Sequence, residues 1–234
     1  MRLLSIESTA KAASVALTEG GKLIAQYFQN SALTHSRTLL KMAEDMLSNL
    51  ELTLNDIDAI AVAIGPGSFT GVRIGISVAK GLCWGGNKPC YGVSTLEAMA
   101  YHLVDREDVI ICSVMDARRN QIYNAKFTSQ GGELLRLCPD RAISVDELIS
   151  EAKADGKKYF FVGDGASLCY NAFEQSGTCC GIVIDPLTHQ TAWGVAMAAE
   201  RTSPVPAEDI IPNYLRLSQA ERERLERLSK ENSK

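Results

Sequence analysis

The first half of the chain alternates between short apolar runs and helical repeats. Three β-like runs come first, at residues 3–8, 13–18 and 23–28, and a Glu-Gly-Gly turn at residues 19–21 joins the last two as an antiparallel hairpin. From residue 34 to 50 apolar residues recur at three- and four-residue spacing. This spacing predicts an amphipathic helix with one stripe facing the core.

A buried strand is expected at residues 57–64, and it leads through a glycine-rich turn into a second helix at residues 69–84. Residues 91–93 read as another short strand. The helix after it is capped by Ser94 or Thr95, with Glu97 placed as in a capping box.

The same order of elements then begins again in the second half. The expected elements are strands at 109–115, 121–127 and 133–137, a helix at 144–154, a strand at 159–162, a helix after residues 163–165 and a last helix at 192–201. A duplicated βββαβαβα unit is the organisation of the actin-like ATPases, sugar kinases and Hsp70 proteins, so we predict a two-lobed α/β fold. The expected divisions are 1–106 for the N-terminal lobe, 107–204 for the C-terminal lobe and 205–234 for a C-terminal segment with a charged tail.

Charge and composition exclude several classes of function. The formal net charge is −4 with both signs interspersed, whereas nucleic-acid binders carry a dominant basic stripe. Any contact with a nucleic acid is therefore expected to be indirect. The seven cysteines include no C-x-x-C pair, and we interpret them as reduced, mostly buried side chains. No signal-peptide core and no apolar run of bilayer length is present, which predicts a cytoplasmic protein without membrane contact.

The glycine-rich block at residues 65–75, GPGSFTGVRIG, is the most specific feature. It is neither a P-loop nor a clean G-x-G-x-x-G motif. It joins a strand to a helix, so its backbone amides could hold an anion. Alternatively, the glycines make a turn and let the helix pack closely.

The helix after this block is apolar nearly all round, which requires cover on both faces. One face can pack on its own sheet. The small residues Gly71, Gly75 and Ala79 at four-residue spacing would let a second helix approach the other. That second helix belongs either to a partner or to the same chain.

Seven segments together carry a resemblance to a known family. They are Ile6-Glu7-Ser8-Thr9, His35-Ser36, the glycine-rich block, Gly92-Val93-Ser94-Thr95-Leu96, Met115-Asp116-Ala117-Arg118-Arg119, Gly163-Asp164-Gly165 and Pro212-Asn213-Tyr214-Leu215-Arg216. In this order they resemble the TsaB (YeaZ) family. The resemblance implies an accessory subunit that pairs with the catalytic subunit TsaD through its N-terminal-lobe helices, joined by the ATPase TsaE. That assembly transfers a threonylcarbamoyl group to the adenosine beside the anticodon of tRNAs that read A-starting codons.

A partner face is expected on the two helices of the first lobe, holding a homodimer when the protein is alone. The expected residues are Ser36, Leu39, Leu40, Ala43, Leu47, Phe69, Thr70, Arg73, Ile74, Gly75, Ser77 and Val78. Gly75→Glu is then expected to separate two molecules while each stays folded.

The sequence also predicts that this chain is not the catalyst. The catalytic relative binds metal through two histidines four apart on the first helix, but here His35 is followed by Leu39, while His102 and His189 stand alone. We therefore expect no metal, no cofactor and no catalytic residue. A vestigial inter-lobe cleft is expected around Glu7, Ser8, Thr9, Asp116, Arg118 and Asp164.

Two enzymatic alternatives stay open: an ATPase or small-molecule kinase that acts in this cleft, and a metallopeptidase. The charged tail from residue 218 to 234 is expected to be a solvated helix, or else a segment that returns to the first lobe or touches a partner.

Overall fold

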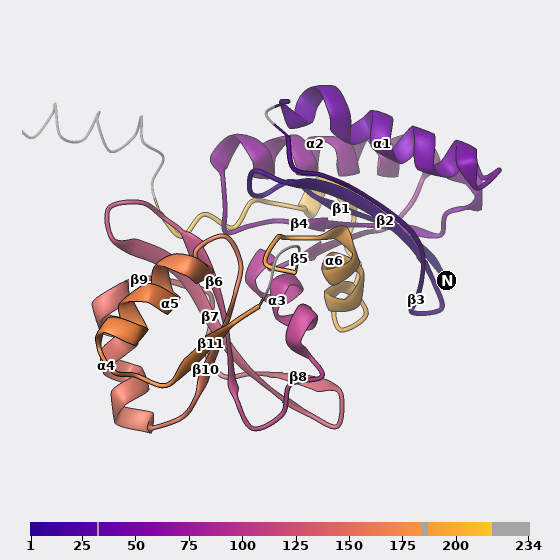
Figure 1. The fold of residues 1–234 in the computed structure, drawn as a ribbon. Helices are drawn as coiled ribbons and strands as arrows, with labels where there is room; N and C mark the ends of the chain where they lie inside the picture. Colours follow the sequence, from indigo (N-terminus) through magenta and orange to yellow (C-terminus); the bar gives the residue numbers. More distant parts are fainter. Residues whose placement is uncertain (32, 184–186, 217–234) are drawn as a thin grey trace, which may run out of the picture.

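The computed structural model describes residues 1–31, 33–183 and 187–216, and the predicted tail helix lies outside these ranges. The chain builds two sheets, each flanked by helices (Figure 1). The elements of the first half are β1 (Arg2–Glu7), β2 (Ala13–Glu19), β3 (Lys22–Gln29), α1 (His35–Asn49), β4 (Ala59–Ala63), α2 (Phe69–Gly86), β5 (Cys90–Val93) and α3 (Thr95–Ala100). Short 3-10 turns occupy Leu54–Asp56, Tyr101–Leu103 and Ala207–Asp209.

The second half repeats the arrangement. Its elements are β6 (Ile110–Asp116), β7 (Gln121–Gln130), β8 (Glu133–Arg136), β9 (Arg141–Ser144), α4 (Val145–Asp155), β10 (Tyr159–Val162), α5 (Ala166–Gln175), β11 (Cys180–Ile182) and α6 (Ala192–Ala199). The strand order is β3-β2-β1-β4-β5 in one sheet and β8-β7-β6-β10-β11 in the other. In the first sheet β1, β2 and β3 are antiparallel neighbours, and β4 and β5 run parallel to β1. In the second sheet β6, β7 and β8 are antiparallel neighbours, and β10 and β11 run parallel to β6. The predicted duplication is confirmed.

Two strands, β9 and β11, were not predicted from the sequence. β9 is mostly polar or half-buried and pairs only with one end of β7, so it lacks the apolar alternation of a core strand. β11 has three residues, pairs with β10 and lies at the edge of its sheet. At the start of α3 the predicted Ser94 cap is present, since the Glu97 amide donates to Ser94 Oγ at 3.2 Å. The Glu97 carboxylate, however, binds Arg136 at 2.6 Å instead of closing a capping box.

The helices α3 and α6 lie between the two sheets (Figure 1). α6 packs on the first sheet, against β1, β2 and β4, although residues 192–199 follow the second sheet in sequence. α3 packs on α6 and on β6. Each half therefore contributes a helix to the core of the other. The domain boundaries expected at residues 106 and 204 stay a prediction.

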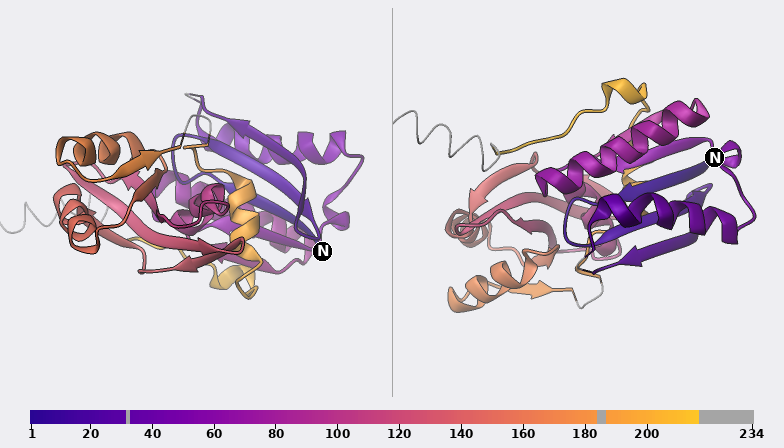
Figure 2. Two further views of the ribbon diagram at one scale, coloured as in Figure 1. Left: turned by 60° about the horizontal axis from the view of Figure 1, so that its bottom comes forward. Right: turned by 90° about the horizontal axis from the view of Figure 1, so that it is seen from above.

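The outer face of the first sheet is covered by α1 and α2, which lie side by side (Figure 2). The buried stripe of α1 and the small residues of α2 enter the same core as β1 and β4. Four residues expected at a partner face belong to this core: Leu39, Ala43, Leu47 and Gly75. That part of the expectation is corrected, because these residues face the chain's own sheet.

The small residues of α2 allow a close approach to β1 and to the loop after it. A Cβ on Gly75 would lie 2.4 Å from Ser8 Oγ, and one on Gly71 would lie 2.1 Å from the Ser8 carbonyl oxygen. Of the two roles open for these glycines, the structure therefore supports close packing. We therefore expect Gly75→Glu to disrupt the monomer instead of separating two folded molecules.

The far side of α2 is covered partly by the C-terminal segment, residues 205–216, which we call the strap (Figure 2). The strap begins with a bridge between Val205 and Cys90, and it buries Ala207 and Ile210 in the first-lobe core. Lys80 Nζ donates to the Glu208 carbonyl at 3.0 Å. The same chain thus supplies some of the cover that α2 requires, while Ile74 and Val78 remain half-buried.

The seven cysteines are free thiols. Cys83, Cys90, Cys112 and Cys169 are buried, and burial raises the pKa of the Cys169 thiol to about 12. Within the described ranges no helix has the length and apolarity that a bilayer crossing requires.

Candidate functional site: the inter-lobe cleft and the outer helix face

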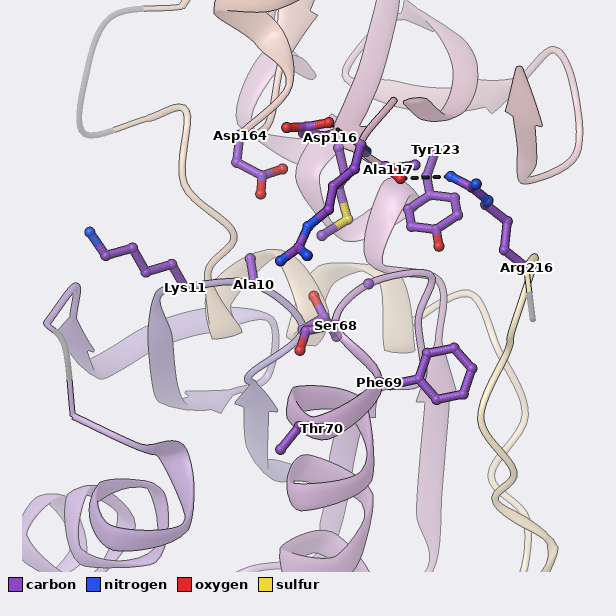
Figure 3. Close-up of a pocket in the computed structure, with 14 residues that line it drawn as sticks. Ala10, Lys11, Ser68, Phe69, Thr70, Asp116, Ala117, Tyr123, Asp164 and Arg216 are labelled. Carbon is purple, nitrogen blue, oxygen red and sulfur yellow. Dashed lines mark hydrogen bonds between the residues drawn. The ribbon is translucent and has the colours of Figure 1, made fainter. Parts of the chain in front are cut away.

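A cleft of about 600 Å³ separates the two lobes (Figure 3). Its lining residues are Thr9, Ala10, Lys11, Gly67, Ser68, Phe69, Thr70, Met115, Asp116, Ala117, Arg118, Tyr123, Asp164 and Arg216. Four of the six residues expected in a vestigial cleft are among them: Thr9, Asp116, Arg118 and Asp164. The other two, Glu7 and Ser8, are buried within the first lobe and do not line the cleft. Ser8 Oγ donates to the Gly71 carbonyl at 2.9 Å.

The first-lobe wall is built by the β1–β2 loop and the start of α2. The Ser68 amide donates to the Thr9 carbonyl at 2.7 Å, and Ser68 Oγ in turn accepts from the Gly71 amide and caps α2. His35 Nε2 lies 2.8 Å from the Ala10 carbonyl oxygen. The histidine that begins α1 therefore holds this loop in place.

The opposite wall carries two carboxylates, Asp116 and Asp164, as Figure 3 shows. Asp116 ends β6 and Asp164 follows β10, and these strands are parallel neighbours, so their carboxyl ends meet at one edge of the sheet. Burial raises the pKa of Asp164, and the charge of Asp116 raises it further, while a hydrogen bond from Gln190 acts in the opposite direction.

The cleft combines cationic and acidic groups. Lys11, Arg118 and Arg216 enter its lining together with the hydroxyl-bearing Ser68 and Thr70. Such a set can hold a small anion. In the part of the chain that the structure describes, no group of three His, Cys, Asp or Glu side chains could hold a metal ion.

Comparison with known proteins shows to which family this arrangement belongs. Residues 23–223 match the family model described as TsaD, tRNA N6-adenosine threonylcarbamoyltransferase. The tRNA threonylcarbamoyladenosine biosynthesis protein TsaB of Haemophilus influenzae is 34% identical over 176 residues, covering 70% of this chain and 72% of the relative. That of Bacillus subtilis is 28% identical over 222 residues, covering 94% of this chain and 96% of the relative. The chain belongs to the TsaB family.

Solved structures agree with this assignment. A crystal structure titled YeaZ from Pseudomonas aeruginosa is 27% identical, covers 92% of this chain and 99% of its own, and has a TM-score of 0.74. A protein of the same organism, titled as uncharacterised with similarity to peptidase YEAZ, is 28% identical with the same coverage and a TM-score of 0.78. The two-lobed actin-like fold predicted from the sequence is thus confirmed for this TsaB-family chain.

The outer surface of α1 and α2 holds the remaining residues expected at a partner face. Ser36, Leu40, Thr70, Arg73 and Ser77 are exposed, and Phe69, Ile74 and Val78 are half-buried. Leu40 exposes 43% of its surface and Trp84, at the far end of α2, exposes 64%. Exposed apolar side chains mark a protein-binding surface where they form a contiguous patch, whereas single ones are ordinary.

Sequence reasoning missed the role of the strap at both sites. Tyr214 stacks on Phe69, with ring centroids 4.0 Å apart and planes inclined by 10°. Arg216 Nη1 donates to the Ala117 carbonyl at 2.6 Å and enters the cleft. The motif at residues 212–216 was visible in the sequence, but a segment without periodicity gives no signal of the elements it crosses.

Glu7 is fully buried, and only one of its oxygens is used. Glu7 Oε1 accepts from the Thr9 amide and the Thr9 hydroxyl, both at 2.6 Å, whereas Oε2 has no hydrogen-bond partner within the described ranges. Burial raises the pKa of Glu7 to about 7, although both bonds from Thr9 lower it. A carboxyl whose pKa is higher when folded favours folding at low pH, and that stability is lost as the pH rises from 4.5 through about 7.

Glu7→Gln should therefore stabilise the protein in alkaline solution. Above about pH 7 the charged Glu7 costs on the order of 3 kcal/mol, which the neutral amide avoids while its oxygen keeps the bonds from Thr9. Urea unfolding at about pH 5 and about pH 8 measures the difference. The exposed Glu51→Gln serves as the control, and an equal gain at both pH values would show that the charge of Glu7 is not the cause.

Proposed function

We propose that this chain is the non-catalytic dimerisation subunit of the assembly that transfers a threonylcarbamoyl group to N6 of the adenosine beside the anticodon, in tRNAs that read A-starting codons. The pathway is supported by similarity to relatives named tRNA threonylcarbamoyladenosine biosynthesis protein TsaB, along 94% of the chain for the Bacillus subtilis protein. The observation that carries the dimerisation role is the outward surface of α1 and α2, where apolar side chains stay exposed or half-buried.

The partner face of this proposal is the exposed part of the two helices. It comprises Ser36, Leu40, Phe69, Thr70, Arg73, Ile74, Ser77 and Val78. In the assembly it binds a TsaD-like catalytic subunit, and in the isolated protein it binds a second copy. A TsaE-like ATPase joins the complex in the cytoplasm, and tRNA is contacted through the partners, in keeping with the net charge of −4.

The accessory role is supported by the chemistry at the start of α1. The family resemblance implies that the catalytic relative holds its metal with two histidines four residues apart on one helix face, and here Leu39 occupies the second position. The imidazole of His35 instead approaches the Ala10 carbonyl oxygen at 2.8 Å. A histidine engaged with the backbone of its own chain positions a loop, and it does not need a metal to do so.

Reconstitution tests this function. The chain is co-purified with the TsaD-like subunit of the same organism, with and without nucleotide, and threonylcarbamoyl transfer to tRNA is measured. We expect a heterodimer, transfer by the full assembly and no transfer by this chain alone. Transfer or steady nucleotide turnover by the isolated chain would instead favour an enzyme that acts in the inter-lobe cleft.

A further inference from the structure

Arg73 lies on the exposed face of α2, next to the aromatic rings of Phe69 and Tyr214. Its Nε donates to the Tyr214 hydroxyl at 2.8 Å. The guanidinium carbon lies 5.5 Å from the Phe69 ring centroid and 5.7 Å from that of Tyr214. Because one edge of the guanidinium is fixed and its plane lies beside two stacked rings, its orientation is set before any partner arrives.

Tyr214 is itself held in place by the strap. The amide of the preceding residue, Asn213, donates to the Ile64 carbonyl at 2.7 Å, and Asn213 Nδ2 donates to Asp140 at 3.4 Å. Two residues beyond Tyr214, Arg216 is bound to the Ala117 carbonyl. With anchors on both sides, the tyrosine ring is a fixed support for Arg73.

The outer edge of the guanidinium remains available. Arg136 and Arg141 are each paired with carboxylates of the chain at 2.6–2.7 Å. Within residues 1–31, 33–183 and 187–216, no carboxylate forms an ion pair with Arg73. Among the described residues, Tyr214 accepts from Nε alone, which leaves the N–H groups of both terminal nitrogens for an outside acceptor. Two parallel N–H groups of this kind match the two oxygens of one carboxylate.

We propose that Arg73, oriented by Tyr214 and Phe69, is the recognition site for a carboxylate on the partner protein. The half-buried Ile74 and Val78 follow Arg73 on the same helix, so the partner should present an Asp or Glu side chain flanked by apolar residues. This inference rests on the proposed function and adds to it the chemistry of the contact. A protein carboxylate fits better than an RNA phosphate, because the net charge of −4 repels a polyanion.

The test measures the affinity of the purified chain for the TsaD-like subunit of the same organism, in low and in high salt. Arg73→Gln should weaken binding about tenfold or more, since a hydrogen-bonded charged group is removed. Arg73→Lys should lie between this variant and the wild type, because an ammonium keeps the charge but not the fork. Tyr214→Phe keeps the ring and loses the orienting hydroxyl, so it should weaken binding less than Arg73→Gln does.

Arg106→Gln is the matched control. Arg106 is also exposed and also lies over an aromatic ring, 5.2 Å from the Phe160 centroid, but that ring belongs to β10 of the second sheet and not to the face of α1 and α2. Arg106→Gln should leave the affinity unchanged. Thermal melts of all variants show whether each is folded, and the loss of affinity on raising the salt should be smaller for Arg73→Gln than for the wild type.

The outcomes separate this inference from the proposed function. If the wild type binds and Arg73→Gln binds within about twofold of it, the carboxylate contact is refuted while the dimerisation role stands. If Arg73→Gln weakens only self-association, or only the binding of tRNA, and binds the TsaD-like subunit as the wild type does, the acceptor is not on that subunit and the inference fails. If the wild type does not bind the catalytic subunit at all, both fail.

Discussion

Gly71→Ala should destabilise the fold by about 3 kcal/mol or more, although it adds a single methyl group to a helix. The added Cβ would lie 2.1 Å from the Ser8 carbonyl oxygen, far inside van der Waals contact. The loop that carries this oxygen cannot retreat easily. Ser8 Oγ donates to the Gly71 carbonyl, and the Ser68 amide donates to the Thr9 carbonyl. The helix would have to move off the sheet instead.

Gly81→Ala provides the control on the same helix. Gly81 is exposed, and a Cβ there would meet no atom within 4 Å. Alanine in an open helical position should stabilise by up to about 1 kcal/mol, so the two substitutions should change the free energy of unfolding in opposite directions. Denaturant melts of both variants measure this. A Gly71→Ala protein as stable as the wild type would mean that α2 does not sit against the β1–β2 loop as described.

The duplicated architecture could be predicted because each half carries its own periodicity. Alternating apolar residues mark the strands, and three- and four-residue spacing marks α1 and α4, so the order of elements follows from local patterns. What such patterns do not contain is the sheet that a helix will cover. α6 occupies the position in the second half that α3 occupies in the first. Because α6 is apolar on all sides, its sequence does not show which sheet it packs against.

The glycines of α2 show the same limit at the candidate interface. Small residues at four-residue spacing do predict a close approach, and the structure has one. The approaching group, however, is Ser8, which lies 63 residues before Gly71 in the chain. A spacing rule identifies a contact surface but not its partner, and the expected placement of Gly75 at an intermolecular surface was wrong for this reason.

The exposed residues of α2 therefore give the sharper test of the partner face. Ser77 is exposed and lies between Ile74 and Val78 along the outer surface of the helix. An arginine at position 77 can extend into water in the free monomer, so the fold should be unaffected. A glutamate would be a poorer choice, because Arg73 one turn earlier could pair with it and hide its charge.

Ser77→Arg should weaken binding to the TsaD-like subunit about a hundredfold or more, because docking would bury an unpaired charge among apolar side chains, at a cost of several kcal/mol. Homodimer formation should fall in parallel. Ser150→Arg is the control: Ser150 is exposed on α4 in the other lobe, with its hydroxyl bonded to the Asp146 carbonyl of its own helix. Light scattering after size exclusion, titration with the partner and circular-dichroism melts give the three readouts. A folded Ser77→Arg protein that binds as tightly as the wild type would exclude the outer face of α2 from the interface.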